Sequence, residues 1–291
     1  MTIPLVGAAA SGRWVRRVLG AAALGLAGPV AALPVVTGGL RAAYEFGGNA
    51  ADVTGNGNAL TVVGATFTAD RFGNPDSALL FDDVHDYART EGPVLDIGGA
   101  YSLNWWFRLD TADNGYPSQT LFNTDPHTGI GIAFNHASDP GPVMRYYLGT
   151  GQAGWDISGS GGADGVSGAN RAITVGQWHQ QTLVQDGGTW RFYLDGVLDA
   201  EIGSALAFSL SPQFYFGQSS FRDTWLPAFR PEPFSGAMDD ISLYARALSV
   251  AEIGALGAAP AAGVPEPDTA PLLVLAGLAG LVGGRGRFRR R

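Results

Sequence analysis

Residues 101–109 have the sequence YSLNWWFRL, in which every second side chain is apolar. Successive side chains of a β-strand point to opposite faces, so this period of two predicts a long strand with one buried face. The residues expected on the buried face are Tyr101, Leu103, Trp105, Phe107 and Leu109. The other face carries Asn104, Trp106 and Arg108, which we expect to point away from the core.

Shorter stretches of the same kind follow one another along the chain, separated by Gly, Asn, Asp and Pro. Residues 190–194 alternate up to Asp195-Gly196, a dipeptide that supplies the positive φ angles of a two-residue hairpin turn, and Val197 resumes the pattern. Further strands are expected at residues 43–46, 60–63, 78–81, 121–123, 130–134, 144–148, 179–184, 214–216 and 238–244. So many short strands predict an all-β fold of two packed antiparallel sheets.

One short helix is expected after the last of these strands. Ser249 and Glu252 have the spacing of a capping box, in which each side chain bonds the backbone N–H of the other residue. Gly257 suits the end of such a helix. Residues 258–263 are small and contain Pro and Gly, so we interpret them as a linker.

The amino-terminal segment has the pattern of a secretory signal peptide. A positive stretch ends with Arg16 and Arg17, apolar residues 18–27 follow, and small residues up to Ala32 suit cleavage. We therefore predict that residues 1–32 form a signal helix and that the body of the protein is exported.

The carboxyl-terminal segment combines three features in a fixed order. The motif Val264, Pro265, Glu266, Pro267 is followed by apolar residues 270–284 and an arginine-rich tail. An apolar segment closed by arginines can enter a bilayer as a single membrane helix while its charges stay in the cytoplasm. The combination resembles the PEP-CTERM sorting signal of exported bacterial proteins, which implies processing by an exosortase. An ordinary C-terminal membrane anchor is the alternative.

The charge of the chain excludes some classes of partner. The formal net charge is −8, and the body alone is more negative, because eight of the 18 basic residues lie in the two predicted terminal signals. A strongly acidic body opposes binding to nucleic acid. The chain has no cysteine, which excludes disulfides, thiol catalysis and zinc–thiolate sites.

Five blocks of the body resemble a known family. They are residues 40–58, 71–81, 100–109, 176–196 and 234–249. In this order and spacing they are similar to the laminin-G-like, concanavalin A-like jelly roll of many exported bacterial proteins. The predicted organisation is a signal peptide at 1–32, a laminin-G-like jelly-roll domain at 33–257, a linker at 258–263 and the sorting signal at 264–291. The resemblance leaves the function open, because this sandwich carries lectins, adhesins, hydrolases and lyases.

The same resemblance implies a structural calcium ion, held between an early turn and a late strand. The residues expected to hold it are Glu45, Asp52, Asp239 and Asp240. Calcium takes six to eight oxygen ligands, which carboxylates and loop carbonyls supply. The alternative is that one aspartate is buried by hydrogen bonds to turn amides and the others are solvated.

Sugar binding uses flat aromatic faces beside polar groups, so the tryptophans are candidate ligand contacts. Trp106 shares the polar face of its strand, and Trp155 and Trp225 lie in irregular segments. We predict a ligand surface at these three residues, with loop anchoring as the alternative. The tryptophans interpreted as core residues are Trp105, Trp178 and Trp190.

No catalytic motif is present. The glucan-cleaving relatives carry an E-x-D-x-E arrangement and many esterases carry G-x-S-x-G, but this chain has neither. We therefore expect a non-catalytic carbohydrate-binding or adhesion protein. We expect a membrane-anchored precursor in the cell envelope and a mature protein on the outer surface or in the extracellular matrix. The expected partner is an extracellular polysaccharide or a surface glycan. A divergent glycan-active enzyme and a structural matrix protein are the alternatives.

Overall fold

The computed structural model describes residues 34–82, 84–96, 98–116, 118–124, 130–134, 143–148, 165–203, 213–218 and 232–258. The predicted signal peptide, Trp155, Trp225 and the sorting motif Val264-Pro265-Glu266-Pro267 lie outside these residues. Among the described residues, no helix combines the length and apolar character that crossing a membrane requires.

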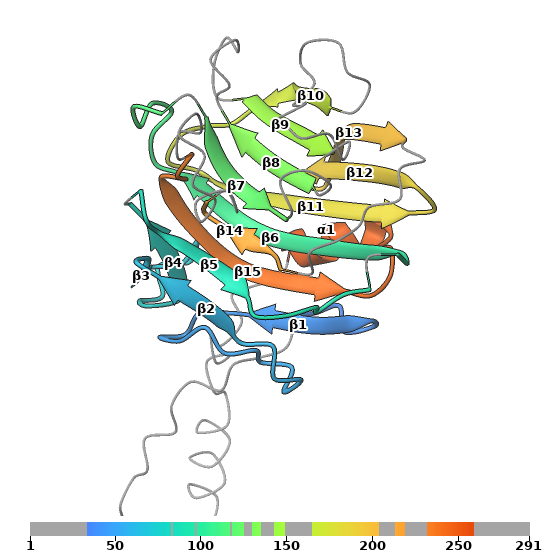
Figure 1. The fold of residues 1–291 in the computed structure, drawn as a ribbon, viewed down its shortest axis with the longest axis horizontal. Coiled ribbons are helices and arrows are strands. Elements are labelled where there is room, and N and C mark those ends of the chain that lie inside the picture. Colours follow the sequence, from blue (N-terminus) through green and yellow to red (C-terminus); the bar gives the residue numbers. More distant parts are fainter. Residues whose placement is uncertain are drawn as a thin grey trace, which may run out of the picture. The chain divides into compact units, whose positions relative to one another are not determined.

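The described residues form two antiparallel sheets (Figure 1). The eight-stranded sheet contains, in spatial order, β13 (Val197–Gly203), β12 (Thr189–Leu194), β11 (Trp178–Asp186), β6 (Tyr101–Leu109), β15 (Gly236–Tyr244), β4 (Ala78–Phe81) and β3 (Thr66–Thr68), and β1 (Leu40–Tyr44) also pairs with β15. The seven-stranded sheet contains β10 (Gly165–Ala172), β9 (Val143–Leu148), β8 (Ile130–Phe134), β7 (Gln119–Asn123), β14 (Tyr215–Phe216), β5 (Tyr87–Thr90) and β2 (Leu60–Val63). The expected two-sheet jelly-roll fold is confirmed.

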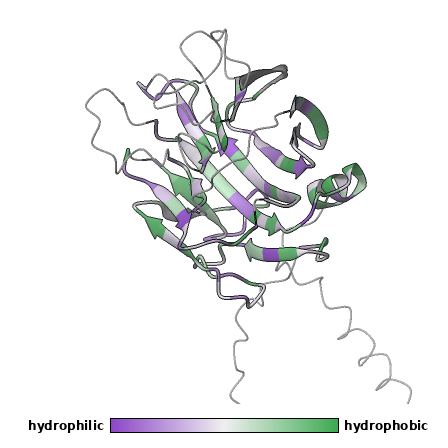
Figure 2. Ribbon diagram, turned by 45° about the vertical axis from the view of Figure 1, so that its right-hand side comes forward, coloured by the Kyte–Doolittle hydropathy of each residue, from purple (hydrophilic) through white to green (hydrophobic). Residues whose placement is uncertain are grey.

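The core lies between the two sheets. The apolar side of β6 is buried as predicted, and the ring of Trp105 lies 5.5 Å from that of Phe122 in β7 and 6.1 Å from that of Phe216 in β14. Figure 2 shows hydrophobic and hydrophilic residues alternating along the strands, as a half-buried sheet requires. The predicted hairpin at Asp195-Gly196, which joins β12 to β13, is also confirmed, with φ angles of 49° at Asp195 and 73° at Gly196. The strands β3, β5 and β10 were not predicted.

A second, smaller cluster covers part of the outer side of the eight-stranded sheet. Helix α1 (Val250–Ala258) packs there against β11, β12 and β15, together with the first described residues of the chain. The buried members are Val36, Val184, Tyr193, Tyr244, Leu248, Ile253 and Leu256. The capping box is confirmed, because Ser249 N donates to Glu252 Oε2 at 2.9 Å and Glu252 N donates to Ser249 Oγ at 3.3 Å.

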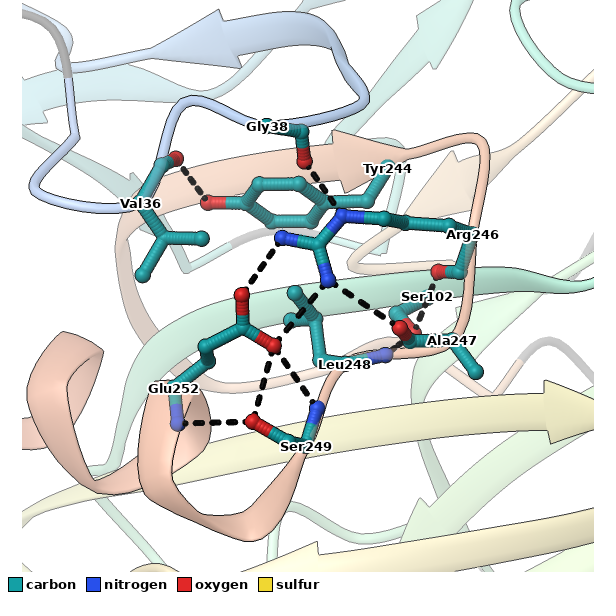
Figure 3. Close-up of polar contacts among 9 residues, drawn as sticks. All are labelled: Val36, Gly38, Ser102, Tyr244, Arg246, Ala247, Leu248, Ser249 and Glu252. Carbon is teal, nitrogen blue, oxygen red and sulfur yellow. Dashed lines mark hydrogen bonds and ion pairs between the residues drawn. The ribbon is translucent and has the colours of Figure 1, made fainter.

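Arg246 joins the amino-terminal segment to this helix (Figure 3). Its Nε donates to the carbonyl of Gly38 at 2.6 Å, and its Nη1 and Nη2 donate to the Glu252 carboxylate at 3.0 and 2.7 Å. The Tyr244 hydroxyl adds a bond to the carbonyl of Val36 at 3.1 Å. We call these contacts the Arg246 clasp; they fix residues 36–38 and α1 on one half of the outer face.

The clasp predicts a specific pH dependence of stability. Hydrogen bonds from Arg246 and Ser249 lower the pKa of Glu252 from 4.5 to about 2. A group with a depressed pKa in the folded state stabilises the protein above its unfolded pKa and loses that contribution as the pH falls through the folded pKa. The difference in unfolding free energy between wild type and Glu252→Gln should therefore shrink as the pH falls from 4.5 to 2.

Urea unfolding at several pH values measures this difference. Glu201→Gln is the matched control, because Glu201 forms an ion pair with Arg191 but 49% of its side chain is exposed. Its effect should be small at every pH. A wild-type to Glu252→Gln difference that stays constant over this range would contradict the role given to the clasp.

Candidate functional site

The part of the outer face beside α1 carries aromatic rings and guanidinium groups. Trp106 and Arg108 point outward from β6 because they alternate with the buried Trp105 and Phe107. Trp178 in β11 is the cross-strand partner of Arg108. The loop between β3 and β4 adds two further side chains to the same region. We call the set the aromatic–arginine face; its members are Arg71, Phe72, Trp106, Arg108 and Trp178.

The guanidinium groups lie over the rings. The Arg71 Cζ atom is 4.4 Å from the ring centre of Phe72 and 4.6 Å from that of Trp106. The Arg108 Cζ atom is 5.4 Å from the ring centre of Trp178. Such cation–π contacts contribute about 0.5–2 kcal/mol each, depending on their desolvation. They hold the rings in fixed positions before any ligand arrives.

The face is open to solvent to different degrees. Phe72 is 49% exposed, and Trp106 and Trp178 are half-buried. Phe72 is held by its own loop, since Asp70 Oδ1 accepts hydrogen bonds from the backbone N–H groups of Phe72 and Asn74, both at 2.8 Å. A half-exposed aromatic ring on a fixed backbone can accept the apolar C–H face of a sugar at little entropic cost.

Asp239 and Asp240 lie beside this face and share one partner. Arg71 Nη1 is 3.0 Å from Asp239 Oδ2 and 2.5 Å from Asp240 Oδ2. Consecutive strand residues normally point to opposite faces, but the pairing of β15 with β6 shifts register between Asp239 and Ser242, and Asp240 has a positive φ of 47°. This β-bulge lets both carboxylates reach the same guanidinium.

The electrostatics of the pair depend on this guanidinium. Burial raises the pKa of Asp239 well above its ordinary value, the charge of Asp240 raises it further, and Arg71 opposes the rise. Burial likewise raises the pKa of Asp240, again against Arg71. The arginine therefore compensates two carboxylates that burial would otherwise favour as neutral acids.

The other two predicted calcium ligands lie on or beside β1, which pairs with β15 so that Tyr44 is opposite Ile241. Asp52 Oδ1 accepts hydrogen bonds from Ala43 N, Thr54 N and Thr54 Oγ1, and Asp52 Oδ2 accepts one from Asn58 N. Burial acts to raise the pKa of Asp52, but these hydrogen bonds lower it overall. Glu45 directly follows β1 and is 9% exposed. Asp52 thus makes the turn-amide contacts that the alternative interpretation described.

Within the described part of the chain, no group of three or more His, Asp or Glu side chains is placed so that it could hold a metal ion. The positive charge next to Asp239 and Asp240 is supplied by Arg71. Calcium binding at these residues stays a prediction, and it would require Arg71 to move away from the two carboxylates.

The predicted tryptophan roles divide into three groups. Trp105 and Trp190 are buried, which confirms their interpretation as core residues. The same interpretation of Trp178 is wrong: it is half-buried on the outer face, because β11 alternates so that Trp178 lies on the side of Gln180 and away from His179. Trp106 is half-buried against Arg71.

His179, one of the histidines in the described part of the chain, is held by hydrogen bonds on both sides of its ring. His179 Nδ1 is 2.9 Å from Asp195 Oδ2, and Thr174 N donates to His179 Nε2 at 3.2 Å. Both ring nitrogens therefore have protein partners, and the ring packs 5.7 Å from that of Phe107. This arrangement positions the loop before β11.

Comparisons with known proteins identify the family. Residues 82–254 match the family described as the Concanavalin A-like lectin/glucanases superfamily (Laminin_G_3), and since the match covers more than half of the chain, the chain belongs to this superfamily. No curated protein matches the sequence.

Three solved structures illustrate the likeness in fold. Domain 4 of AbnA, a GH43 extracellular arabinanase from Geobacillus stearothermophilus solved with arabinotriose, is 20% identical with a TM-score of 0.52, covering 75% of this chain and 98% of the domain. The binding domain of botulinum neurotoxin DC in complex with SialylT is 12% identical (TM-score 0.53; 75% of this chain, 51% of that one). Trypanosoma rangeli sialidase is 16% identical (TM-score 0.55; 77% of this chain, 33% of that one). At these identities the comparisons show the fold alone.

Replacing Arg71 should destabilise the protein in a pH-dependent way. Arg71→Met leaves two buried carboxylates without their counter-ion, which should cost about 3 kcal/mol at neutral pH. A carboxyl group whose pKa is raised in the folded state binds its proton more readily there than in the unfolded chain, so the loss should decrease as the pH falls. Urea unfolding at neutral and mildly acidic pH tests this, with Arg71→Lys, which keeps the charge, as the control. An equal loss at both pH values would contradict it.

The calcium prediction can be tested by thermal unfolding with calcium and with chelator. Calcium should raise the midpoint if Asp239 and Asp240 bind it. The increase should be larger in Arg71→Met, because no guanidinium competes with the cation, and it should be absent in Asp239→Asn. Magnesium at equal concentration is the control for a non-specific ionic effect. An unchanged midpoint in wild type and in Arg71→Met would end the calcium prediction.

Proposed function

We propose that this protein is an exported, non-catalytic carbohydrate-binding or adhesion module that binds an extracellular polysaccharide or surface glycan through the aromatic–arginine face. One observation carries the proposal: three aromatic rings and two guanidinium groups lie together on the part of the outer face beside α1. Membership of a superfamily that contains lectins supports it.

The chemistry of the face suits a sugar ring. Phe72 and Trp178 offer ring surface for the C–H groups of a sugar. Arg108, whose side chain is 25% exposed and paired with Asp110, offers N–H donors to hydroxyl oxygens. Ligand sites typically combine aromatic rings with a small number of polar groups, and these polar groups fix the orientation of the ligand. The expected ligand is therefore a glycan chain that stacks at least one of its rings.

The proposed localisation of the protein rests on the sequence. The amino-terminal signal pattern and the VPEP, apolar and arginine segments support export, transient contact with the membrane and processing by an exosortase. The acidic charge of the body supports solubility in the envelope or extracellular matrix.

A divergent glycan-active enzyme is the second candidate, and one observation favours it. Burial raises the pKa of Glu232, although hydrogen bonds from Thr120 and Ser118 act against the rise. A carboxyl group with a raised pKa can serve as the general acid of a glycoside hydrolase. Such a hydrolase needs a second carboxylate at a distance of about 5–9 Å.

Glycan-array binding by the purified full-length chain tests the proposal. Trp178→Ala and Phe72→Ala should each weaken binding of the best ligand about tenfold, which corresponds to about 1.4 kcal/mol. Trp178→Phe should retain part of the affinity, because it keeps a ring at this position. Val250→Ala is the control, since Val250 is 60% exposed on α1 and outside the face.

The other outcomes identify the alternatives. No binding to any glycan by a folded wild type would contradict the proposal and favour a structural matrix protein. Release of products from a bound polysaccharide, lost in Glu232→Gln, would favour the enzyme. Affinity unchanged in Phe72→Ala and Trp178→Ala would place the binding site elsewhere.

A further inference from the structure

The seven-stranded sheet carries a second cluster of aromatic and charged side chains that point outward. Thr61 in β2, Arg89 in β5 and Tyr215 in β14 are cross-strand partners and form one row across three strands. The residues on either side of each one in the sequence are buried or packed against the core, so all three point outward. Tyr87, two residues before Arg89, points the same way.

The members of this cluster are in contact. The rings of Tyr87 and Tyr215 have their centres 6.2 Å apart with an interplanar angle of 32°. The Tyr215 hydroxyl donates to Gln213 Oε1 at 3.0 Å. A side-chain hydrogen bond with Tyr215 raises the pKa of Arg89 above its ordinary value. The two rings and the guanidinium thus form one connected surface.

Charged groups extend the cluster towards β2. Arg89 Nη2 is 3.6 Å from Glu91 Oε1, and Thr61 donates a hydrogen bond to the same carboxylate. The Arg89 side chain is 27% exposed and that of Glu91 57%. The Nε of Arg89 is buried and has no hydrogen-bond partner among the described residues. The exposed part of this guanidinium is where a ligand oxygen could accept a hydrogen bond. We call Thr61, Tyr87, Arg89, Glu91 and Tyr215 the Tyr215 cluster.

The two surfaces face in opposite directions. Trp105 and Phe216 meet in the core, one from each sheet. Their neighbours Trp106 and Tyr215 therefore point away from the core on opposite sides of the sandwich. The sheets of a sandwich are about 10 Å apart, so a short glycan segment on one outer face does not reach the other.

We propose that the Tyr215 cluster is a second carbohydrate-binding surface, so that one protein molecule bridges two polysaccharide chains. The inference rests on the proposed function of the aromatic–arginine face. Both surfaces offer half-exposed rings, a guanidinium and a carboxylate, which is the set of groups that stacks on a sugar ring and bonds its hydroxyls. Two such surfaces on opposite sides turn a binder into a cross-linker of polymer chains.

Bridging and binding can be measured separately on the full-length chain. Affinity electrophoresis through gels that contain arabinan, xylan, alginate or hyaluronan identifies the polysaccharide that retards the wild type most. Light scattering of that polysaccharide in solution, titrated with protein, then reports bridging. Wild type should increase the scattering and, in large excess, reverse the increase, because each chain is then covered by proteins bound through one face.

Variants of the Tyr215 cluster should separate the two properties. Tyr215→Ala should lower the scattering about tenfold while the aromatic–arginine face still retards the protein in the gel. Arg89→Gln provides a second variant with a milder change at a partly exposed side chain. Val250→Ala should behave as wild type, and melting curves and size-exclusion chromatography show that each variant is folded and in the same oligomeric state.

Each outcome bears on the inference. Retardation with no increase in scattering, or scattering by a folded Tyr215→Ala or Arg89→Gln equal to that of wild type, would overturn the second surface and leave the proposed function intact. Retardation by none of the four polysaccharides, together with no binding on the glycan array, would overturn both. Loss of scattering in the Tyr215-cluster variants, with retardation kept, supports the inference.

Discussion

The packing of Trp105 against Phe122 and Phe216 is the interaction on which the rest of the structure depends. Trp105 is completely buried in the middle of β6, which pairs with β11 on one side and β15 on the other. Because side chains alternate along a strand, burying this indole determines which face of the sheet each of the remaining residues of β6 points to. Trp106 and Arg108 reach the outer face only because Trp105 and Phe107 are held in the core.

The bulge in β15 is an exception to this alternation, and it connects the candidate site to the fold. Without the positive φ of Asp240, its carboxylate and that of Asp239 would point to opposite faces. With it, both hold Arg71, and Arg71 in turn lies over the rings of Phe72 and Trp106. The same residues therefore stabilise the loop between β3 and β4 and orient the aromatic rings. A rigid surface of this kind loses little conformational entropy when a ligand binds.

The Arg246 clasp limits where ligands can reach the eight-stranded sheet. It fixes α1 and the segment from Val36 to Gly38 over β11, β12 and β15, so this half of the outer face is already covered. The aromatic–arginine face lies beside the covered half, and the Tyr215 cluster lies on the other sheet. The division between a covered and an open half thus depends on the clasp and on the apolar cluster packed beneath α1.

The sequence by itself determined the features that depend on neighbouring residues. The alternation in residues 101–109, the Asp195-Gly196 turn and the Ser249–Glu252 capping box are all found as expected, because each acts over a few residues. Trp106 could be placed on the outer face for the same reason. What only the tertiary structure decided is the set of partners: Arg71 meets Asp239 across 168 positions of the chain, and Trp178 lies beside Arg108 through the register of β11 and β6. The register between strands that are far apart in the sequence, and the bulge in β15, depend on the packing of the whole sandwich.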